Sequence, residues 1–234
     1  MASANAPGNG DCGIPIAGEH DSLRLAFKAS LDNGFLVLVS GMIIFLEVYL
    51  CLVAWFFLGP VGGILSVSGI LFPTYGALYS VLSRVLDGRR FDIGGFVQDL
   101  GAYYGRCFCL GLTGYLLVSA WFFTAKLIMT QGASWLLGPL VIQTTLGVLF
   151  AVVVNYFFVL MVRNRVRFWE LLKVSYVLGF RNGVNTAKML VFKGGIWALN
   201  IITLGAFLMF STGFMIFFDF YEIRLSLERI KTRA

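Results

Sequence analysis

The apolar run Asn155-Tyr-Phe-Phe-Val-Leu-Met-Val162 ends in three closely spaced arginines, Arg163, Arg165 and Arg167. These arginines lie between two segments that are apolar enough to cross a lipid bilayer. Lys and Arg residues beside membrane spans remain on the cytoplasmic side, so this stretch predicts the direction of the spans around it. The chain is therefore predicted to be a multi-pass membrane protein, with this loop in the cytoplasm.

The composition of the chain supports a membrane location. Of its 234 residues, 59% are hydrophobic and only 13% are charged, whereas soluble domains have about 45–50% apolar and about 25% charged residues. The net charge of +6 comes from Lys and Arg between and after apolar runs, so no nucleic-acid partner is needed to explain it. We expect an all-α, polytopic transmembrane helix bundle in a bacterial inner membrane, with a cytoplasmic N-terminus.

Four spans have clear ends in the sequence. They are expected over residues 34–58, 61–82, 108–128 and 136–162. Gly59-Pro60 predicts the turn between the first two spans, and Pro73 predicts a kink in the second, because proline removes one backbone hydrogen bond. The aromatic triplets Trp55-Phe-Phe57 and Trp121-Phe-Phe123 are typical of residues that anchor a span at the membrane interface.

Residues 185–220 allow two predictions. One long tilted helix over about 194–218 gives five spans and an external C-terminal tail. Two short spans, about 186–203 and 206–220, turn near Leu204-Gly205 and give six spans with a cytoplasmic tail. Six spans leave every Lys and Arg except Lys126 on the cytoplasmic side, so we favour six.

Amphipathic helices are expected on the cytoplasmic surface between the spans. One follows Arg89-Arg90, is capped by Asp92, and has its apolar stripe at Ile93, Phe96, Val97, Leu100 and Tyr104. The second follows Arg167 and begins at Phe168. The chain then divides into a cytoplasmic N-terminal tail with a short interfacial helix (residues 1–33, disordered to residue 20), the transmembrane bundle (34–220), and a basic cytoplasmic tail (221–234).

Several short motifs together resemble those of uncharacterised bacterial membrane proteins. They are Pro73-Thr-Tyr-Gly-Ala-Leu-Tyr79, Arg84-Val-Leu-Asp-Gly88, Arg167-Phe-Trp-Glu-Leu-Leu172 and Asp219-Phe-Tyr-Glu-Ile-Arg224. The chain is similar over residues 34–225 to the YesL-like proteins and to the membrane domain of glycerophosphodiester phosphodiesterases. The resemblance implies a six-helix bundle with a cytoplasmic tail and, for YesL-like members, a helper role beside carbohydrate uptake systems. It implies no catalytic residues.

Metal and enzyme chemistry have little support in the sequence. The chain has one histidine, His20, and its Cys107-x-Cys109 pair is too closely spaced for a zinc knuckle. No HExxH, GxSxG or P-loop pattern occurs. We expect no metal, no cofactor and no enzymatic activity.

Glu47 is the one acidic residue deep within an early span, roughly 20 Å into a bilayer core about 30 Å thick. Asn200 and Gln143 lie at comparable depths on other spans, and Lys126 lies near the outer interface. These four residues are a candidate intramembrane polar site for a proton or small solute. The alternative is that a neutral Glu47 makes an interhelical hydrogen bond that only fixes packing.

Two hypotheses for function follow. The first is a non-enzymatic accessory or scaffold protein that binds anionic lipid headgroups or a membrane or transport partner through its basic loops. The residues expected to make this contact are Arg89, Arg90, Arg163, Arg165, Arg167, Trp169 and Lys173. The second is a small-solute permease or channel-like component that uses the polar site around Glu47.

Overall fold

The computed structural model describes residues 21–163, 167–203 and 205–233, and every regular element in these ranges is helical. The elements are α1 (Asp21–Asp32), α2 (Gly34–Ser66), η1 (Val67–Leu71), α3 (Phe72–Leu86), α4 (Ile93–Gln131), η2 (Ser134–Leu136), α5 (Leu137–Arg163), α6 (Phe168–Arg181), α7 (Gly183–Ile202) and α8 (Leu208–Arg233). The all-α prediction is confirmed. The tail expected to be disordered, residues 1–20, and Arg165 lie outside the described residues.

Three described segments are long and apolar enough to cross a membrane: Gly34–Leu86, Ile93–Gln131 and Ser134–Arg163. The first is interrupted at Gly59, whose backbone has φ 63° and ψ −149°. Such a positive φ is readily adopted only by glycine, and Pro60 follows it directly. The segment therefore contains two apolar stretches separated at the predicted turn.

The irregularity expected at Pro73 takes the form of a short π-helix. Residues Val67–Leu71 form η1, and Pro73 occupies the first turn of α3 immediately afterwards. Proline has no N–H to donate to the carbonyl four residues earlier, so the helix widens locally over the preceding turn. η1 is followed directly by α3 with no intervening loop.

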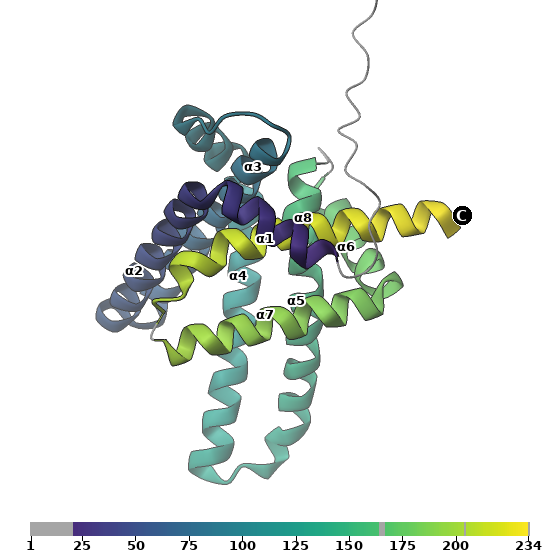
Figure 1. The fold of residues 1–234 in the computed structure, drawn as a ribbon. Coiled ribbons are helices and arrows are strands. Elements are labelled where there is room, and N and C mark those ends of the chain that lie inside the picture. Colours follow the sequence, from purple (N-terminus) through teal and green to yellow (C-terminus); the bar gives the residue numbers. More distant parts are fainter. Residues whose placement is uncertain (1–20, 164–166, 204, 234) are drawn as a thin grey trace, which may run out of the picture.

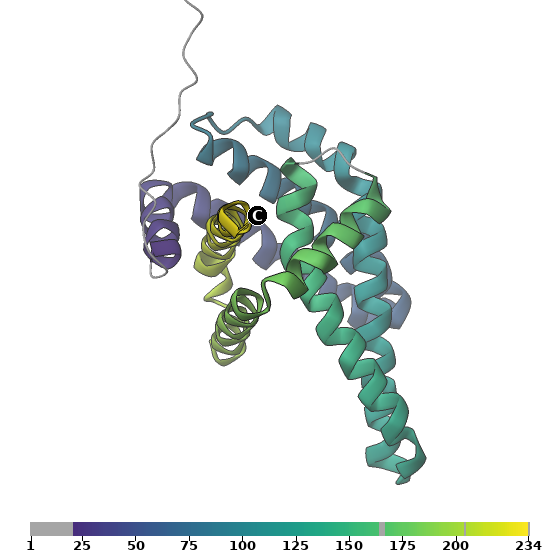
Figure 2. The same cartoon turned by 90° about the vertical axis from the view of Figure 1, so that its right-hand side faces the viewer.

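α4 and α5 form a long hairpin that extends beyond the other helices (Figures 1 and 2). The side chain of Asp92 caps α4 by accepting hydrogen bonds from the backbone N–H groups of Gly94 and Gly95, at 3.2 and 2.9 Å. The cap confirms the helix start predicted at Asp92. At the far end, Gly132 adopts φ 63° and terminates the helix.

α4 continues from Ile93 to Gln131 without a break, which differs from the separate interfacial helix expected over residues 93–104. The expected apolar stripe is also divided, because Ile93 and Val97 are exposed whereas Phe96 packs against the core. At this end, Asp99 forms an ion pair with Arg84 of α3 at 2.5 Å. That ion pair fixes the start of α4 against α3.

The helices after Arg167 fold back across the hairpin. α6 packs along α5, with Leu171, Ser175 and Gly179 on its buried face. α7 and α8 are separate helices joined through Gly205 at φ 83°, so the alternative of one long helix over residues 194–218 is wrong. They are antiparallel and run across the α4–α5 hairpin rather than alongside it (Figures 1 and 2). In addition, α8 continues to Arg233, past the boundary expected at residue 220.

α8 is the central helix of the fold. Its residues from Met215 to Phe220 are all buried, and it packs mainly on α2 and α1. α2 and α8 approach so closely at Gly41 that a Cβ atom there would lie 1.9 Å from the carbonyl oxygen of Met209. Only glycine permits this contact, because any side chain would overlap the backbone of α8.

Candidate functional site

Side chains from four helices meet in a buried polar cluster, which consists of Tyr79, Asn155, Lys193 and Asp219. Lys193 of α7 donates hydrogen bonds from Nζ to Asp219 Oδ2 of α8 at 2.7 Å and to Asn155 Oδ1 of α5 at 2.6 Å. Tyr79 of α3 donates its hydroxyl to the same Asp219 oxygen. The Asp219 side chain is fully buried and that of Lys193 is 15% exposed. The cluster therefore connects α3, α5, α7 and α8 through one carboxylate and one ammonium group.

The sequence of α7 explains how Lys193 reaches the interior. Thr186, Lys193 and Asn200 are spaced seven residues apart, which places them on one stripe of a helix. Thr186 pairs with the Tyr156 hydroxyl of α5 at 2.8 Å, and Asn200 donates to Ser211 Oγ of α8 at 3.3 Å. The inward face of α7 is thus a ladder of polar contacts, with Lys193 at its centre.

The outward face of α7 is largely apolar, with Lys188 as an exposed charged residue near its start. Val191, Ile201 and Ile202 are each about three-quarters exposed (76%, 75% and 76%), whereas Asn185, Thr186 and Asn200 on the same helix are buried. A helix surrounded by water shows the opposite pattern, with its apolar residues buried. Polar residues turned inward and apolar residues turned outward are typical of a helix that is surrounded by lipid.

Aromatic rings surround the Tyr79 side of the cluster. The Tyr79 ring stacks on Phe158 with 5.1 Å between centroids, and contacts Phe220 at 5.7 Å and Tyr75 at 5.2 Å. These rings exclude water from the Asp219 carboxylate. In such low-dielectric surroundings, the attraction between Lys193 and Asp219 is strong, and separating the two charges is costly.

Two polar atoms of the cluster lack a hydrogen-bond partner within the described ranges. Asp219 Oδ1 and Asn155 Nδ2 are buried and have no hydrogen-bond partner among the described residues. One is an acceptor and the other a donor, and both belong to side chains held by Lys193. A water molecule or a solute hydroxyl can both donate and accept, so it has the functions that these two atoms lack.

The candidate site predicted from sequence is divided in the structure. Glu47 lies on α2 beside Thr74 of α3, whereas Asn200 on α7 pairs with Ser211 of α8. Both Glu47 Oε2 and Asn200 Oδ1 are buried without a partner in the part of the chain that is described. The two residues therefore occupy different helix interfaces, and each has one side-chain oxygen without a hydrogen-bond partner in the described ranges.

Gln143 and Lys126 lie on the α4–α5 hairpin, where Trp121 Nε1 donates to Thr144 Oγ1 at 3.0 Å and joins the two helices. Lys126 is exposed and is the only charged residue between Arg106 and Arg163. No hydrogen bond between any two of the four predicted residues is found within the described ranges. The four do not form one site.

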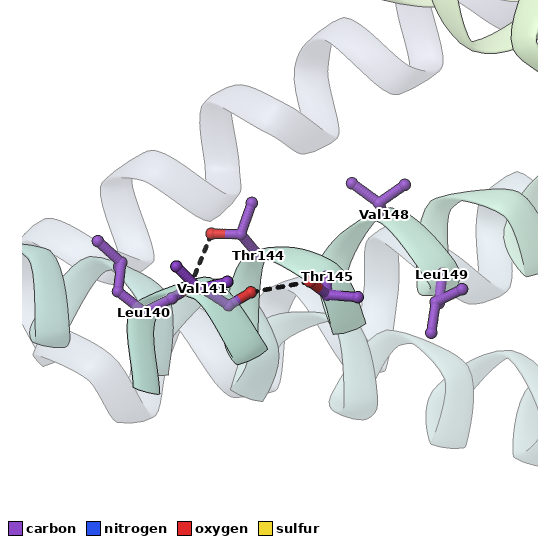
Figure 3. A pocket seen from close by; sticks show the side chains of 6 residues that line it. All are labelled: Leu140, Val141, Thr144, Thr145, Val148 and Leu149. Carbon is purple, nitrogen blue, oxygen red and sulfur yellow. Dashed lines mark hydrogen bonds between the residues drawn. The ribbon is translucent and has the colours of Figure 1, made fainter. Parts of the chain in front are cut away.

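A shallow apolar hollow of about 380 Å³ lies on α5 and is shown in Figure 3. It is lined by Leu140, Val141, Thr144, Thr145, Val148 and Leu149. Its two threonine hydroxyls donate to the carbonyls of Leu140 and Val141 one turn earlier, at 2.8 and 2.9 Å. Because these hydroxyls are satisfied within their own helix, the hollow presents no open polar group and has the character of a lipid-facing surface.

The predicted contact residues lie at two corners of the fold. Arg89 and Arg90 are exposed in the α3–α4 loop, and Arg167, Trp169 and Lys173 are exposed at the start of α6. In Figures 1 and 2, the α3–α4 loop and the adjoining ends of α5 and α6 lie at the end of the molecule opposite the α4–α5 loop. The structure thus brings the two basic corners to the same end.

Arg163, also in the predicted contact set, lies at the C-terminal end of α5. Its guanidinium group is placed over the Phe220 ring, 5.6 Å from the centroid. Part of its side chain therefore packs against the core. Within the described ranges, no three His, Cys, Asp or Glu side chains converge as metal ligands would.

Sequence reasoning missed Lys193 and Asp219 as site residues. Lys193 counts as one of the basic residues after the fourth predicted span, and Asp219 ends the last predicted span. The signal for Lys193 was the seven-residue repeat of polar residues in a helix whose other positions are mostly apolar. Asp219 had no comparable signal, because its partners come from other helices.

Comparison of this chain with known protein families, with curated proteins and with solved structures finds no match in any of the three.

Proposed function

We propose that this protein is a non-enzymatic accessory or scaffold component of a bacterial inner membrane, and that it binds anionic lipid headgroups or a membrane partner through its two basic corners. One observation carries the proposal: Arg89, Arg90, Arg167 and Lys173 are exposed at one end of a strongly apolar molecule. Trp169 beside them is 73% exposed. Arginines that flank an exposed tryptophan suit an anionic membrane surface or a protein partner.

The rigid interior supports a scaffold role. The Lys193–Asp219 pair and its partners connect four helices, and the close α2–α8 contact at Gly41 adds a fifth. A fold held in this way presents its basic corners at a constant separation. The resemblance to YesL-like proteins is consistent with a helper role beside an uptake system.

Photocrosslinking at Trp169 tests the contact. With a photoreactive phenylalanine analogue at position 169, we expect irradiation of membranes to give a defined protein or lipid adduct. Replacing Arg89, Arg90, Arg167 and Lys173 by Gln should reduce that adduct at least tenfold. The matched control is Arg24→Gln with Lys28→Gln, two exposed basic residues on α1, which should leave it unchanged. Absence of an adduct, or equal loss in the control, contradicts the proposal.

The permease hypothesis has a specific observation in its favour, although at a different place from the one predicted. Ionisable residues buried within a membrane commonly mark proton or solute pathways. Lys193 and Asp219 form such a pair, and Asp219 Oδ1 and Asn155 Nδ2 are open beside it. This second candidate predicts flux in proteoliposomes that Asp219→Asn abolishes and Glu47→Gln does not. Absence of flux in the wild-type protein would rule out the permease candidate and leave the scaffold proposal as the remaining one.

The topology that accompanies the proposal is six membrane-embedded segments with both termini in the cytoplasm. The antiparallel course of α7 and α8 supports it, because the chain after α8 then returns to the side on which α6 lies. The crosswise direction of this pair is the feature that differs from a bundle of parallel spans. Labelling of Ala206→Cys by a membrane-impermeant maleimide decides the point. Labelling from outside the cell supports six crossings, and its absence in intact cells supports a hairpin that re-enters the membrane.

A further inference from the structure

A groove of about 270 Å³ lies between α2 and the α7–α8 turn. Its apolar wall is formed by Phe45, Val48 and Leu52 of α2, Ile201 of α7 and Leu208 of α8. Tyr49 of α2 and Trp197 of α7 also line it, together with Asn200 and Gly205. It is separate from the polar cluster, whose residues are not among those that line it.

The groove is continuous with a lipid-facing surface. One wall belongs to Gly34–Leu86, a segment long and apolar enough to cross a membrane. The opposite wall belongs to α7 and the start of α8, and the exposed face of α7 is largely apolar. Tyr49, Leu52 and Trp197, at the mouth of the groove, are each more than half exposed (61%, 61% and 51%). Whatever fills the groove therefore enters from the bilayer.

Polar atoms occupy one part of the groove lining. Asn200 is buried, donates through Nδ2 to Ser211, and has no partner for Oδ1 among the described residues. Tyr and Trp side chains have an apolar body and one polar tip, and are typical of the level at which lipid headgroups meet acyl chains. The groove thus combines an apolar lining with a few polar atoms at its edge, from Tyr49, Trp197 and Asn200.

We propose that this groove is a specific binding site for one acyl chain of a membrane glycerolipid. The aliphatic and aromatic side chains of α2 and α8 surround the chain, and Tyr49, Trp197 and Asn200 face its more polar glycerol end. A bound lipid would fill the space between α2 and the α7–α8 turn. The inference requires that α2 and α7 are embedded in lipid, but it does not depend on the partner contact at the basic corners.

Fluorescence quenching at Trp197 tests the occupant. In a variant whose other four tryptophans are Phe, nanodiscs with increasing fractions of chain-brominated phosphatidylglycerol should quench Trp197. When the lipid of these nanodiscs is exchanged for unbrominated lipid, a lipid held in a specific site should leave slowly and keep Trp197 quenched, whereas quenching by bulk lipid should be lost at once. The control is the variant that keeps only Trp55, which is 55% exposed on α2 and lies outside the groove. Identical curves for the two tryptophans overturn the proposal.

Native mass spectrometry gives a second, independent measurement. Wild-type protein purified in mild detergent should retain one lipid that survives repeated delipidation, and Val48→Phe should reduce its occupancy at least fivefold. Val141→Phe makes the same change in the hollow on α5 and should have no effect. Leu52→Phe, at a more exposed position of the groove, repeats the test should Val48→Phe not fold. No retained lipid in the wild type, or equal retention in all variants, overturns the proposal.

Discussion

The two helical hairpins of this protein, α4–α5 and α7–α8, differ in the interactions that hold their helices together. Between Arg106 and Arg163 the first has a single charged residue, Lys126, and its outer half extends away from the other helices. The second has Lys193 and Asp219 in its interior and packs across the centre of the fold. The first hairpin is mostly apolar along its outer half, whereas the second combines buried apolar side chains, such as Ile216 and Phe217, with buried polar ones.

The difference shows where stability is concentrated. Apolar side chains in lipid gain little from helix association, because lipid tails are as apolar as the partner helix. Close backbone packing and buried polar contacts provide specificity instead. α7 and α8 contain both kinds of contact, whereas the outer half of the α4–α5 hairpin is joined by the Trp121–Thr144 hydrogen bond. Substitutions should therefore matter much more in the second hairpin.

The largest effect is expected for Asp219→Ala. This change leaves the Lys193 ammonium group buried without a counter-charge, which costs about 3–5 kcal/mol. The free energy of unfolding in an SDS titration measures it. The double variant Lys193→Met with Asp219→Leu should recover most of the loss, because it removes both charges. A loss in Asp219→Ala below 1 kcal/mol would show that the pair is solvated.

Close packing of α2 on α8 gives the next effect. Gly41→Ala places a methyl group within 1.9 Å of the Met209 carbonyl oxygen, so the helices must separate at a cost of about 1–3 kcal/mol. Gly147→Ala on α5 is the matched control, since nothing lies within 4 Å of its Cβ position. It should raise stability by up to about 1 kcal/mol through helix propensity. Effects of the same sign in the two variants would contradict the packing argument.

A smaller effect is expected at the start of α7. Thr186→Val removes the hydrogen bond to the buried Tyr156 hydroxyl and should lower the free energy of unfolding by about 1 kcal/mol. Thr145→Val on α5 removes a hydroxyl that bonds only to its own helix, at Val141, and should change nothing measurable. The same SDS titration measures the free energy of unfolding of both variants. Equal losses would show that the polar contacts of α7 contribute no more than a hydrogen bond within one helix.

The smallest effect is expected within the α4–α5 hairpin itself. Thr144→Val removes the acceptor for Trp121 Nε1 at an exposed position, so the loss should be no more than about 0.6 kcal/mol. Tryptophan emission of a variant retaining only Trp121 would report the broken bond directly. A loss larger than that of Thr186→Val would reverse the proposed ranking of the two hairpins.

Local features of the sequence determined much of the fold. Asp92 predicted the start of α4, and Gly59-Pro60 predicted the break after the first apolar stretch. The region of Gly205 predicted the separation of α7 from α8. Each of these features acts on the backbone within a few residues, so its effect does not depend on distant partners. The alternation of apolar runs and arginines likewise predicted a membrane protein with all its basic loops on one side.

Tertiary structure alone decided which polar residues meet. Glu47, Gln143, Asn200 and Lys126 were grouped by depth along separate spans, and depth says nothing about the direction in which a side chain points. The cluster that does form joins Asp219 to Tyr79, 140 residues away, and to Lys193, 26 residues away. Such contacts depend on how helices rotate and cross. The crosswise packing of α7 and α8 creates them. The seven-residue polar repeat places Lys193 on one stripe of α7, but it does not show which residues that stripe meets.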